Sequence, residues 1–218
     1  RQPAPGWFGA AMAAAPACSG AGRRVFAHFE RAALADCRVM PDGQITVRIA
    51  PENRPINPSP WYGFVVASDA PGETLVTLNY DGGTHRYAPW RALPGGKAQR
   101  LPPERVAVVE GGASTTLRLP AAPAQLIIAQ PPESVEGVLA PFEARVAAGQ
   151  VSRSIAGHSV ARRPLFVYHH RPARPRGTIV IITRQHPPET TGPQAFGTFT
   201  DILLGPSRAA RALRADHT

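Results

Sequence analysis

The most informative part of this sequence is residues 178–190, which read TIVIITRQHPPET. Residues 178–183 are mostly apolar and β-branched, and their number fits a buried strand. The Pro-Pro pair that follows cannot continue the strand and disfavours helix at the residue before it. We therefore expect His186 and Glu189 on a loop at the C-terminal end of the strand, the edge where ligands bind in an open α/β sheet. From such a loop an imidazole and a carboxylate can both reach one zinc ion.

Spacing alone leaves an alternative open, because a histidine and a glutamate three residues apart also occur as a solvated pair on a Pro-rich turn. The wider sequence adds a resemblance to a known family. Residues 184–192, RQHPPETTG, resemble the first zinc-binding motif of the zinc metallocarboxypeptidases, in particular their cytosolic-carboxypeptidase-like branch. Residues 51–64, PENRPINPSPWYGF, are similar to the signature of the β-sandwich that precedes the catalytic domain in that branch. Residues 159–164, SVARRP, match in part the segment that opens the catalytic domain, with Ala161 and Arg162 replacing the usual Glu and Gly.

The resemblance implies an α+β fold. An N-terminal antiparallel β-sandwich would be followed by the opening strands and helices of an α/β zinc carboxypeptidase domain. We accordingly expect a signal-like or disordered segment at residues 1–17, the β-sandwich domain at residues 18–131, and a helix with an incomplete catalytic domain at residues 132–218.

The resemblance also implies a function, the zinc-dependent removal of C-terminal residues from peptides or proteins. His186 and Glu189 would be two of the three protein ligands that hydrolytic zinc sites use. In the family the third ligand, the general base and the arginines that grip the substrate carboxylate follow the first motif. Here His217 is the only later histidine, and it is a poor candidate for a ligand carried by a strand. We therefore expect no catalytic residue within this chain, a fragment that is inactive alone, and weak zinc binding.

The composition limits the partners. The formal net charge is +9, carried almost wholly by arginine, since Lys97 is the only lysine. The arginines are scattered and no basic face studded with aromatic residues is evident, so no nucleic-acid partner is expected. By resemblance, the expected partners are peptide or protein C-termini, including acidic ones that a positive potential would attract. Because no apolar run approaches about eighteen residues, no membrane span is expected.

Two cysteines, Cys18 and Cys37, bear on localisation. Residues 8–17 are small and apolar, contain several Ala-x-Ala sites, and look like the end of a secretory signal. In a periplasmic or secreted protein the two cysteines are expected to pair, and a loop of that length stabilises the fold by roughly 3 kcal/mol. In the cytoplasmic alternative they would stay unpaired and buried.

Short strands are predicted from residue 38 to 130. Residues 44–49 alternate as a half-buried strand does, whereas residues 61–67 are apolar on both faces. Hairpins are indicated by strands at 75–80 and 84–87 around Asp81-Gly82-Gly83, and by strands at 105–109 and 115–119 around a Gly-Gly turn, with a last strand at 125–129. Residues 18–37 are ambiguous between a short helix and an opening strand.

From residue 133 the apolar period becomes helical, with Gly149 as a C-cap. Strands are expected at 152–156, 165–169 and 178–183. A helix follows, with Ala195, Phe199, Ile202 and Leu203 on its apolar face, and a second begins at Ser207 as N-cap. His169 and His170 are assigned to the surface or to packing, and no partner is evident for His28, His85 and His158.

The alternative function is a non-catalytic β-sandwich that binds a protein or glycan. In that case the RQHPPETTG loop would be a relic, and Trp61, Tyr62, Tyr87 and Trp90 could form an aromatic binding face. Packing of Trp61 and Tyr62 in the core is the simpler interpretation.

Overall fold

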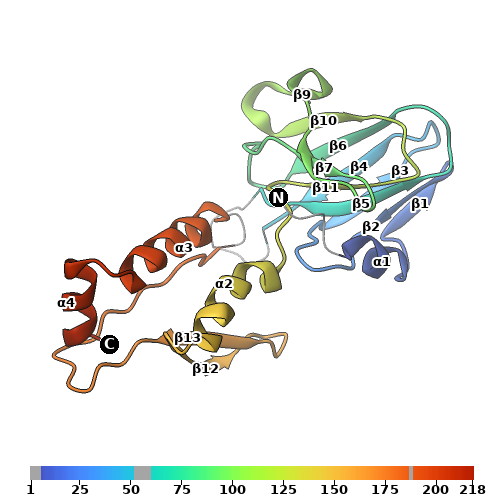
Figure 1. The fold of residues 1–218 in the computed structure, drawn as a ribbon. Coiled ribbons are helices and arrows are strands. Elements are labelled where there is room, and N and C mark those ends of the chain that lie inside the picture. The colour runs from blue at the N-terminus through green and yellow to red at the C-terminus, as the bar shows by residue number, and fades with distance from the viewer. Residues whose placement is uncertain (1–5, 52–59, 187–188) are drawn as a thin grey trace. The chain divides into compact units, whose positions relative to one another are not determined.

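The structure is a computed structural model that describes residues 6–51, 60–186 and 189–218. The chain divides into two compact units, Arg1–Ser134 and Val135–Thr218. Figure 1 traces the chain through both units. Mixed helices and antiparallel sheets confirm the α+β class that the sequence predicts. Among the described residues, no helix is both long and apolar enough to cross a bilayer.

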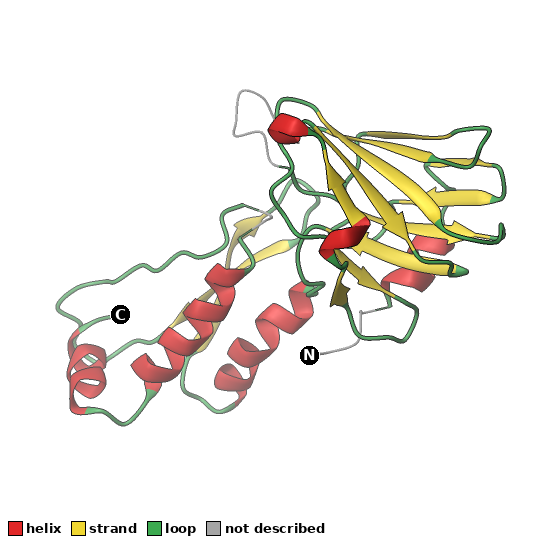
Figure 2. Ribbon diagram, turned by 90° about the horizontal axis from the view of Figure 1, so that it is seen from above, coloured by secondary structure: helices red, strands yellow, loops and turns green. Residues whose placement is uncertain are grey.

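Unit 1 is a sandwich of two β-sheets, drawn in yellow in Figure 2. One sheet has the strand order β1-β2-β5-β11-β7-β8 and the other has the order β3-β4-β6-β10-β9. Neighbouring strands are antiparallel except β4 and β6. The strands are β1 (Cys18–Gly20), β2 (Arg23–Phe26), β3 (Asp36–Val39), β4 (Ile45–Ile49), β5 (Gly63–Ser68), β6 (Thr74–Tyr80), β7 (Trp90–Ala92), β8 (Gln99–Arg100), β9 (Val106–Val108), β10 (Ser114–Leu119) and β11 (Ala124–Ile128).

The core of unit 1 follows the apolar pattern of its strands. In β4, Ile45, Val47 and Ile49 are buried and alternate with more exposed residues, as predicted for a half-buried strand. β5 and β11 are paired neighbours inside the larger sheet, and both are buried along nearly their whole length. Apart from Gln125 in β11 and Ser68 at the end of β5, their residues are apolar or glycine, and this composition matches their burial because a central strand covered on both faces presents no polar side to water.

The hairpin predicted around Asp81-Gly82-Gly83 is wrong. Residues 84–87 form no strand. Both edges of β6 are already occupied, one by β4 and the other by β10, so residues 84–87 cannot pair with it. Instead, Nδ1 of His85 and the hydroxyl of Tyr80 form a hydrogen bond of 2.8 Å. The second predicted hairpin, β9 and β10, is confirmed, and residues 18–37 form strands instead of the alternative helix.

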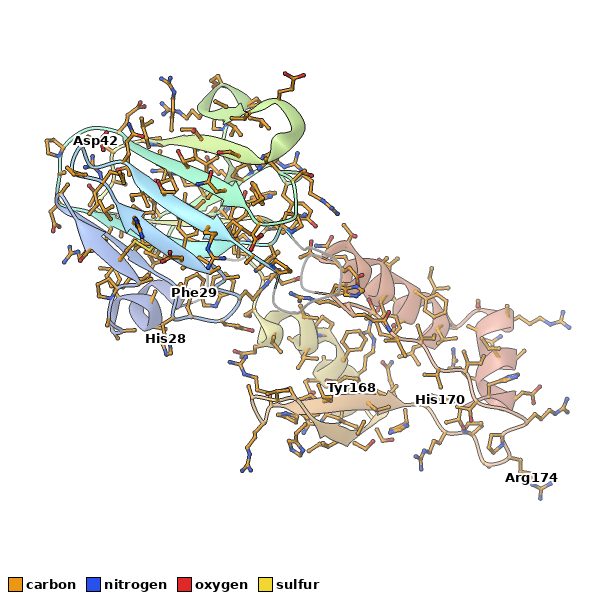
Figure 3. The ribbon with its side chains drawn as sticks, turned by 180° about the vertical axis from the view of Figure 1, so that it is seen from behind. His28, Phe29, Asp42, Tyr168, His170 and Arg174 are labelled. Atoms are coloured by element: carbon orange, nitrogen blue, oxygen red, sulfur yellow. A yellow bond between two sulfur atoms is a disulfide. The ribbon has the colours of Figure 1, made fainter. Side chains whose placement is uncertain are left out.

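The beginning of the chain packs onto the sandwich. Helix α1 (Trp7–Met12) buries Trp7 and Ala11, and the ring of Trp7 lies 5.6 Å from that of Phe29. Phe29 lies beside α1 in the side-chain view (Figure 3). Residues 7–12 are therefore not disordered: they form α1, whose apolar face is buried in the core. The signal-like interpretation of this segment stays a prediction.

A disulfide joins the two sheets of the sandwich. Cys18 on β1 and Cys37 on β3 are bonded, with their Cα atoms 5.8 Å apart. β1 and β3 are the end strands of different sheets, so the bond ties the edge of one sheet to the edge of the other. The pairing that the sequence left open is thus present.

Replacing both Cys18 and Cys37 with serine should lower the free energy of unfolding of unit 1 by roughly 3 kcal/mol, since the unfolded chain gains the freedom of a loop of this size. Tryptophan fluorescence in urea is the suitable measurement, because Trp7, Trp61 and Trp90 are all buried in this unit. An unchanged unfolding midpoint, with or without reductant, would contradict the stabilising role of the bond.

Unit 2 contains helix α2 (Val135–Ala147), the hairpin of β12 (Ser152–His158) and β13 (Pro164–His169), helix α3 (Thr191–Leu204) and helix α4 (Arg208–Asp216). The Phe142 ring of α2 stacks on Phe196 of α3 and packs against Tyr168 of β13. Arg145 of α2 is buried and forms an ion pair with Asp201 of α3. These contacts bind the helices and the hairpin into one unit.

The predicted ends of the helices in unit 2 agree with the structure, whereas the predicted apolar face of α3 agrees only in part. Gly149 follows α2 with φ +69°, and the Ser207 hydroxyl accepts a hydrogen bond from the Ala210 amide at the start of α4. The predicted apolar face of α3 is wrong in part, because Phe199 and Ile202 are exposed while Pro193 and Thr200 are buried. Packing against Phe142 selects the side of the helix that carries Phe196.

The strand predicted at 178–183 is also wrong. These residues are in no sheet of the described structure, and Val180 is 75 % exposed. Among the described residues, only the start of the segment has a backbone partner there: the Ile179 amide donates to the Thr218 carbonyl, and the Thr218 amide donates to the carbonyl of Gly177, just before the segment. A strand requires a neighbour for its ladder, and apolar sequence without one leaves an exposed, extended segment.

The carboxylate of Glu143 links α2 to the hairpin. It accepts hydrogen bonds from Tyr168 Oη at 2.6 Å and from Arg153 Nη1 at 2.8 Å. The hydrogen bond from Tyr168, and then that from Arg153, lower the pKa of Glu143. Because folding favours the ionised form, this contribution to stability is complete above the ordinary pKa of 4.5 and is lost as the pH falls through the lowered pKa.

We therefore predict that unit 2 opens more readily as the pH falls below 4.5, and that Glu143→Gln removes part of this dependence. Hydrogen exchange of peptides spanning 135–170 at a series of pH values measures it. Glu136→Gln, on the same helix and exposed, is the matched control and should keep the wild-type profile. An E143Q profile that superimposes on that of the wild type would contradict the prediction.

Candidate metal centre

The side chains of His186 and Glu189 converge. Nδ1 of His186 lies 2.7 Å from Oε1 of Glu189, and both side chains are about half exposed, at 54 % and 44 %. The pair lies on the loop that precedes α3, as the sequence predicts. The two side chains therefore neither diverge nor lie inside the protein.

The backbone fixes the second oxygen of the Glu189 carboxylate. Oε2 accepts hydrogen bonds from the amides of Gln185 at 2.9 Å and His186 at 3.2 Å. In addition, the Glu189 amide donates to the His186 carbonyl and closes the turn. The imidazole of His186 is the largest cause, and these amides further causes, of a pKa for Glu189 below its usual range. Glu189 thus presents an oriented carboxylate beside the imidazole of His186.

A close approach behind the loop holds it in place. Arg184 has the left-handed φ of 54°, which turns the chain after the extended segment. Gly192, in the first turn of α3, faces Thr183, and a Cβ at Gly192 would stand only 2.9 Å from the Thr183 hydroxyl oxygen. The absence of a Cβ at Gly192 therefore lets α3 begin directly against Thr183, and a larger residue would force the Thr183 side chain to move. Neither the Thr183–Gly192 contact nor the bonds to Oε2 were foreseen from the sequence, although the Thr-Thr-Gly after Glu189 was a signal for such a turn.

The pair fits a divalent metal in part. An imidazole nitrogen and a carboxylate oxygen are ordinary zinc ligands, and two ligands of one tetrahedral ion lie about 3.4 Å apart when each bond is near 2.1 Å. Nδ1 and Oε1 are closer than that because they are directly hydrogen-bonded. A shared ion would replace this bond and require only a modest widening of an exposed pair.

The described residues do not complete a metal site. No group of three or more His, Cys, Asp or Glu side chains able to hold an ion occurs in residues 6–51, 60–186 and 189–218. His217 bonds through Nδ1 to the Leu213 carbonyl of its own helix. His169 and His170 bond to Ser154 and to the Arg214 carbonyl, which agrees with their assignment to the surface or to packing.

The remaining motifs of the resemblance, and the aromatic residues of the alternative function, lie away from His186 in the sequence. Most of the 51–64 signature, and Pro187 and Pro188, lie outside the described residues. The 159–164 motif forms the turn between β12 and β13, closed by the Ser159 amide bonded to the Arg163 carbonyl. The aromatic binding face is wrong, because Trp61, Tyr62 and Trp90 are buried in the sandwich core. Tyr87 is partly buried and packs against the same core.

We predict that Gly192→Ala displaces the loop, because its Cβ would crowd Thr183. An overpacked site typically costs 1–3 kcal/mol, so amide exchange of peptides spanning 183–190 should accelerate by about tenfold or more. Gly197→Ala, in the same helix with open space around it, should stabilise α3 by about 1 kcal/mol instead. Slowed or unchanged exchange in Gly192→Ala would contradict the close approach.

Two comparisons by sequence find nothing: no protein-family model matches the chain, and no curated protein does. Solved structures do match. A metallo-carboxypeptidase from Burkholderia cenocepacia is 21 % identical at a TM-score of 0.65, over 89 % of this chain and 54 % of that one. A metallo-carboxypeptidase from Pseudomonas aeruginosa, solved with (2-guanidinoethylmercapto)succinic acid, is 20 % identical at a TM-score of 0.60, over 88 % of this chain and 52 % of that one. The chain thus spans about half the length of the structures it matches, and it shares their fold over that part.

Proposed function

We propose that this chain is part of a zinc-dependent carboxypeptidase that removes C-terminal residues from peptides or proteins. The observation that carries the proposal is the convergence of His186 Nδ1 and Glu189 Oε1, 2.7 Å apart and exposed. It is supported by the likeness in fold to two metallo-carboxypeptidases. The resemblance of RQHPPETTG to the first zinc motif of the cytosolic-carboxypeptidase-like branch adds to this support.

In this proposal His186 and Glu189 hold the ion, and each has a defined part. The imidazole supplies a neutral nitrogen donor. The Glu189 carboxylate supplies charge, and the amides of Gln185 and His186 keep it pointed toward the imidazole. Zinc, when bound, polarises a scissile carbonyl and lowers the pKa of a coordinated water.

Further polypeptide is needed to complete the site. Among the described residues no third His, Cys, Asp or Glu side chain joins His186 and Glu189 in a group able to hold a metal ion. Unit 2 also exposes an apolar groove of about 400 Å³, which includes Ile179, Ile181 and Phe199. Soluble proteins seldom leave such a surface bare, which supports the proposal that another segment covers it and that the chain is inactive alone.

The substrate class and the compartment are also proposed. Peptide or protein C-termini, including acidic ones, fit the net charge of +9. The Pseudomonas aeruginosa protein was solved with (2-guanidinoethylmercapto)succinic acid, and a carboxylate of that compound resembles the free C-terminus of a peptide. A periplasmic or secreted location is supported by the disulfide between Cys18 and Cys37, since such bonds persist in oxidising compartments.

Zinc binding by the purified chain tests the proposal. After one equivalent of zinc and exhaustive dialysis, we expect substoichiometric retention, because two donors hold the ion weakly. In calorimetry, His186→Ala and Glu189→Gln should each weaken zinc binding by about tenfold or more, since loss of even an outer partner of a ligand costs that much.

His28→Ala is the matched control, because His28 is exposed in unit 1. Its zinc affinity should equal that of the wild type. Equal loss in the control and in H186A would contradict the metal role of His186. A tight one-to-one complex that survives dialysis would contradict the proposal that the site is incomplete.

A further inference from the structure

A second cavity lies in unit 1, far along the sequence from His186. It has a volume of about 390 Å³ and is formed around β7, β8 and the turn between them. Four basic side chains line it, those of Arg91, Lys97, Arg100 and Arg105, and the lining contains no carboxylate. Its volume is within the range of small-molecule pockets, but its lining is cationic where most such pockets are apolar.

Most of this positive charge is not neutralised within the protein. Arg105 forms an ion pair with Glu73 at 2.6 Å. In the described part of the chain, Arg91, Lys97 and Arg100 have no carboxylate within ion-pair distance. Arg100 instead lies over the ring of Trp90. Burial, and then the nearby charge of Arg105, lower the pKa of Arg91.

A buried side chain positions Arg91. Gln125 lies in the apolar strand β11 and is only 1 % exposed. Its amide oxygen accepts a hydrogen bond from Arg91 Nε at 2.6 Å, and its Nε2 donates to the Pro120 carbonyl at 3.2 Å. Because Nε is bonded to Gln125, the guanidinium is fixed in orientation, and its two terminal nitrogens have no hydrogen-bond partner among the residues that the structure describes. A buried amide costs free energy unless it is bonded, so these two bonds explain a glutamine in a core strand.

We propose that this cavity is a binding site for a small molecule that carries two or more anionic groups, either phosphates or carboxylates. Arg91, Lys97 and Arg100 supply the charge. A guanidinium with two free terminal nitrogens matches a phosphate or carboxylate as a fork. The site is independent of the zinc proposal, because none of its residues belongs to unit 2.

Calorimetric titration of the full chain with pyrophosphate and, separately, with citrate tests the proposal. We expect one-to-one binding by at least one of them, and weaker binding as salt is raised, because these cations are partly exposed. Binding of pyrophosphate alone would assign phosphate chemistry, and binding of citrate alone would assign carboxylate chemistry. Absence of binding by both would overturn the proposal.

Two double variants of equal charge distinguish binding in the cavity from general attraction of anions to a positively charged protein. The double variant Lys97→Ala with Arg100→Ala removes two exposed cations from the lining and should weaken binding by about tenfold or more, at 1.4 kcal/mol for each factor of ten. The control, Arg38→Ala with Arg208→Ala, removes the same charge from exposed positions that do not line the cavity.

The control should retain wild-type affinity, and equal weakening would overturn the proposal. Arg91→Lys keeps the charge but loses the fork and the bond to Gln125. It should weaken binding with tryptophan fluorescence unchanged, which separates loss of the site from loss of the fold.

Discussion

The Glu189 carboxylate is the constraint on which the functional account depends. One oxygen meets the imidazole of His186, and the other accepts two backbone amides, so the carboxylate cannot turn without breaking several bonds. The same hydrogen bonds lower the pKa of Glu189 below its usual value. The missing Cβ of Gly192 also lets α3 begin against Thr183 without moving the Thr183 side chain. A bare His-x-x-Glu on a mobile turn would have none of these properties.

The two units are stabilised in different ways, and this shapes what each can do. Unit 1 has an extensive apolar core and a disulfide between its sheets, and it carries the basic side chains around Arg91. Unit 2 depends on one aromatic cluster around Phe142 and on a few ion pairs, and it leaves apolar segments such as residues 179–182 exposed. The chain as a whole spans about half the length of the structures it matches.

What could be predicted from the sequence was local. Alternation predicted β4, an apolar sequence on both faces predicted β5, and the Pro-Pro pair predicted the loop on which His186 and Glu189 lie. Features that depend on pairing between segments far apart in the sequence could not be predicted. β6 pairs with β4 and β10 instead of residues 84–87, and residues 178–183 lack the partner that a strand requires. The cationic cavity was not predicted, although its four basic residues all lie within residues 91–105. That these side chains line one cavity depends on how β7, β8 and the turn between them fold, and a glutamine in the apolar strand β11 was a further local sign.

Anomalous diffraction from crystals of this chain grown with zinc is the most direct test of the central claim, that one imidazole and one carboxylate share a metal ion. The account predicts an anomalous peak bonded, at about 2.1 Å, to both His186 Nδ1 and the Glu189 carboxylate. A peak elsewhere on the protein, with His186 and Glu189 still hydrogen-bonded directly to each other, would contradict it.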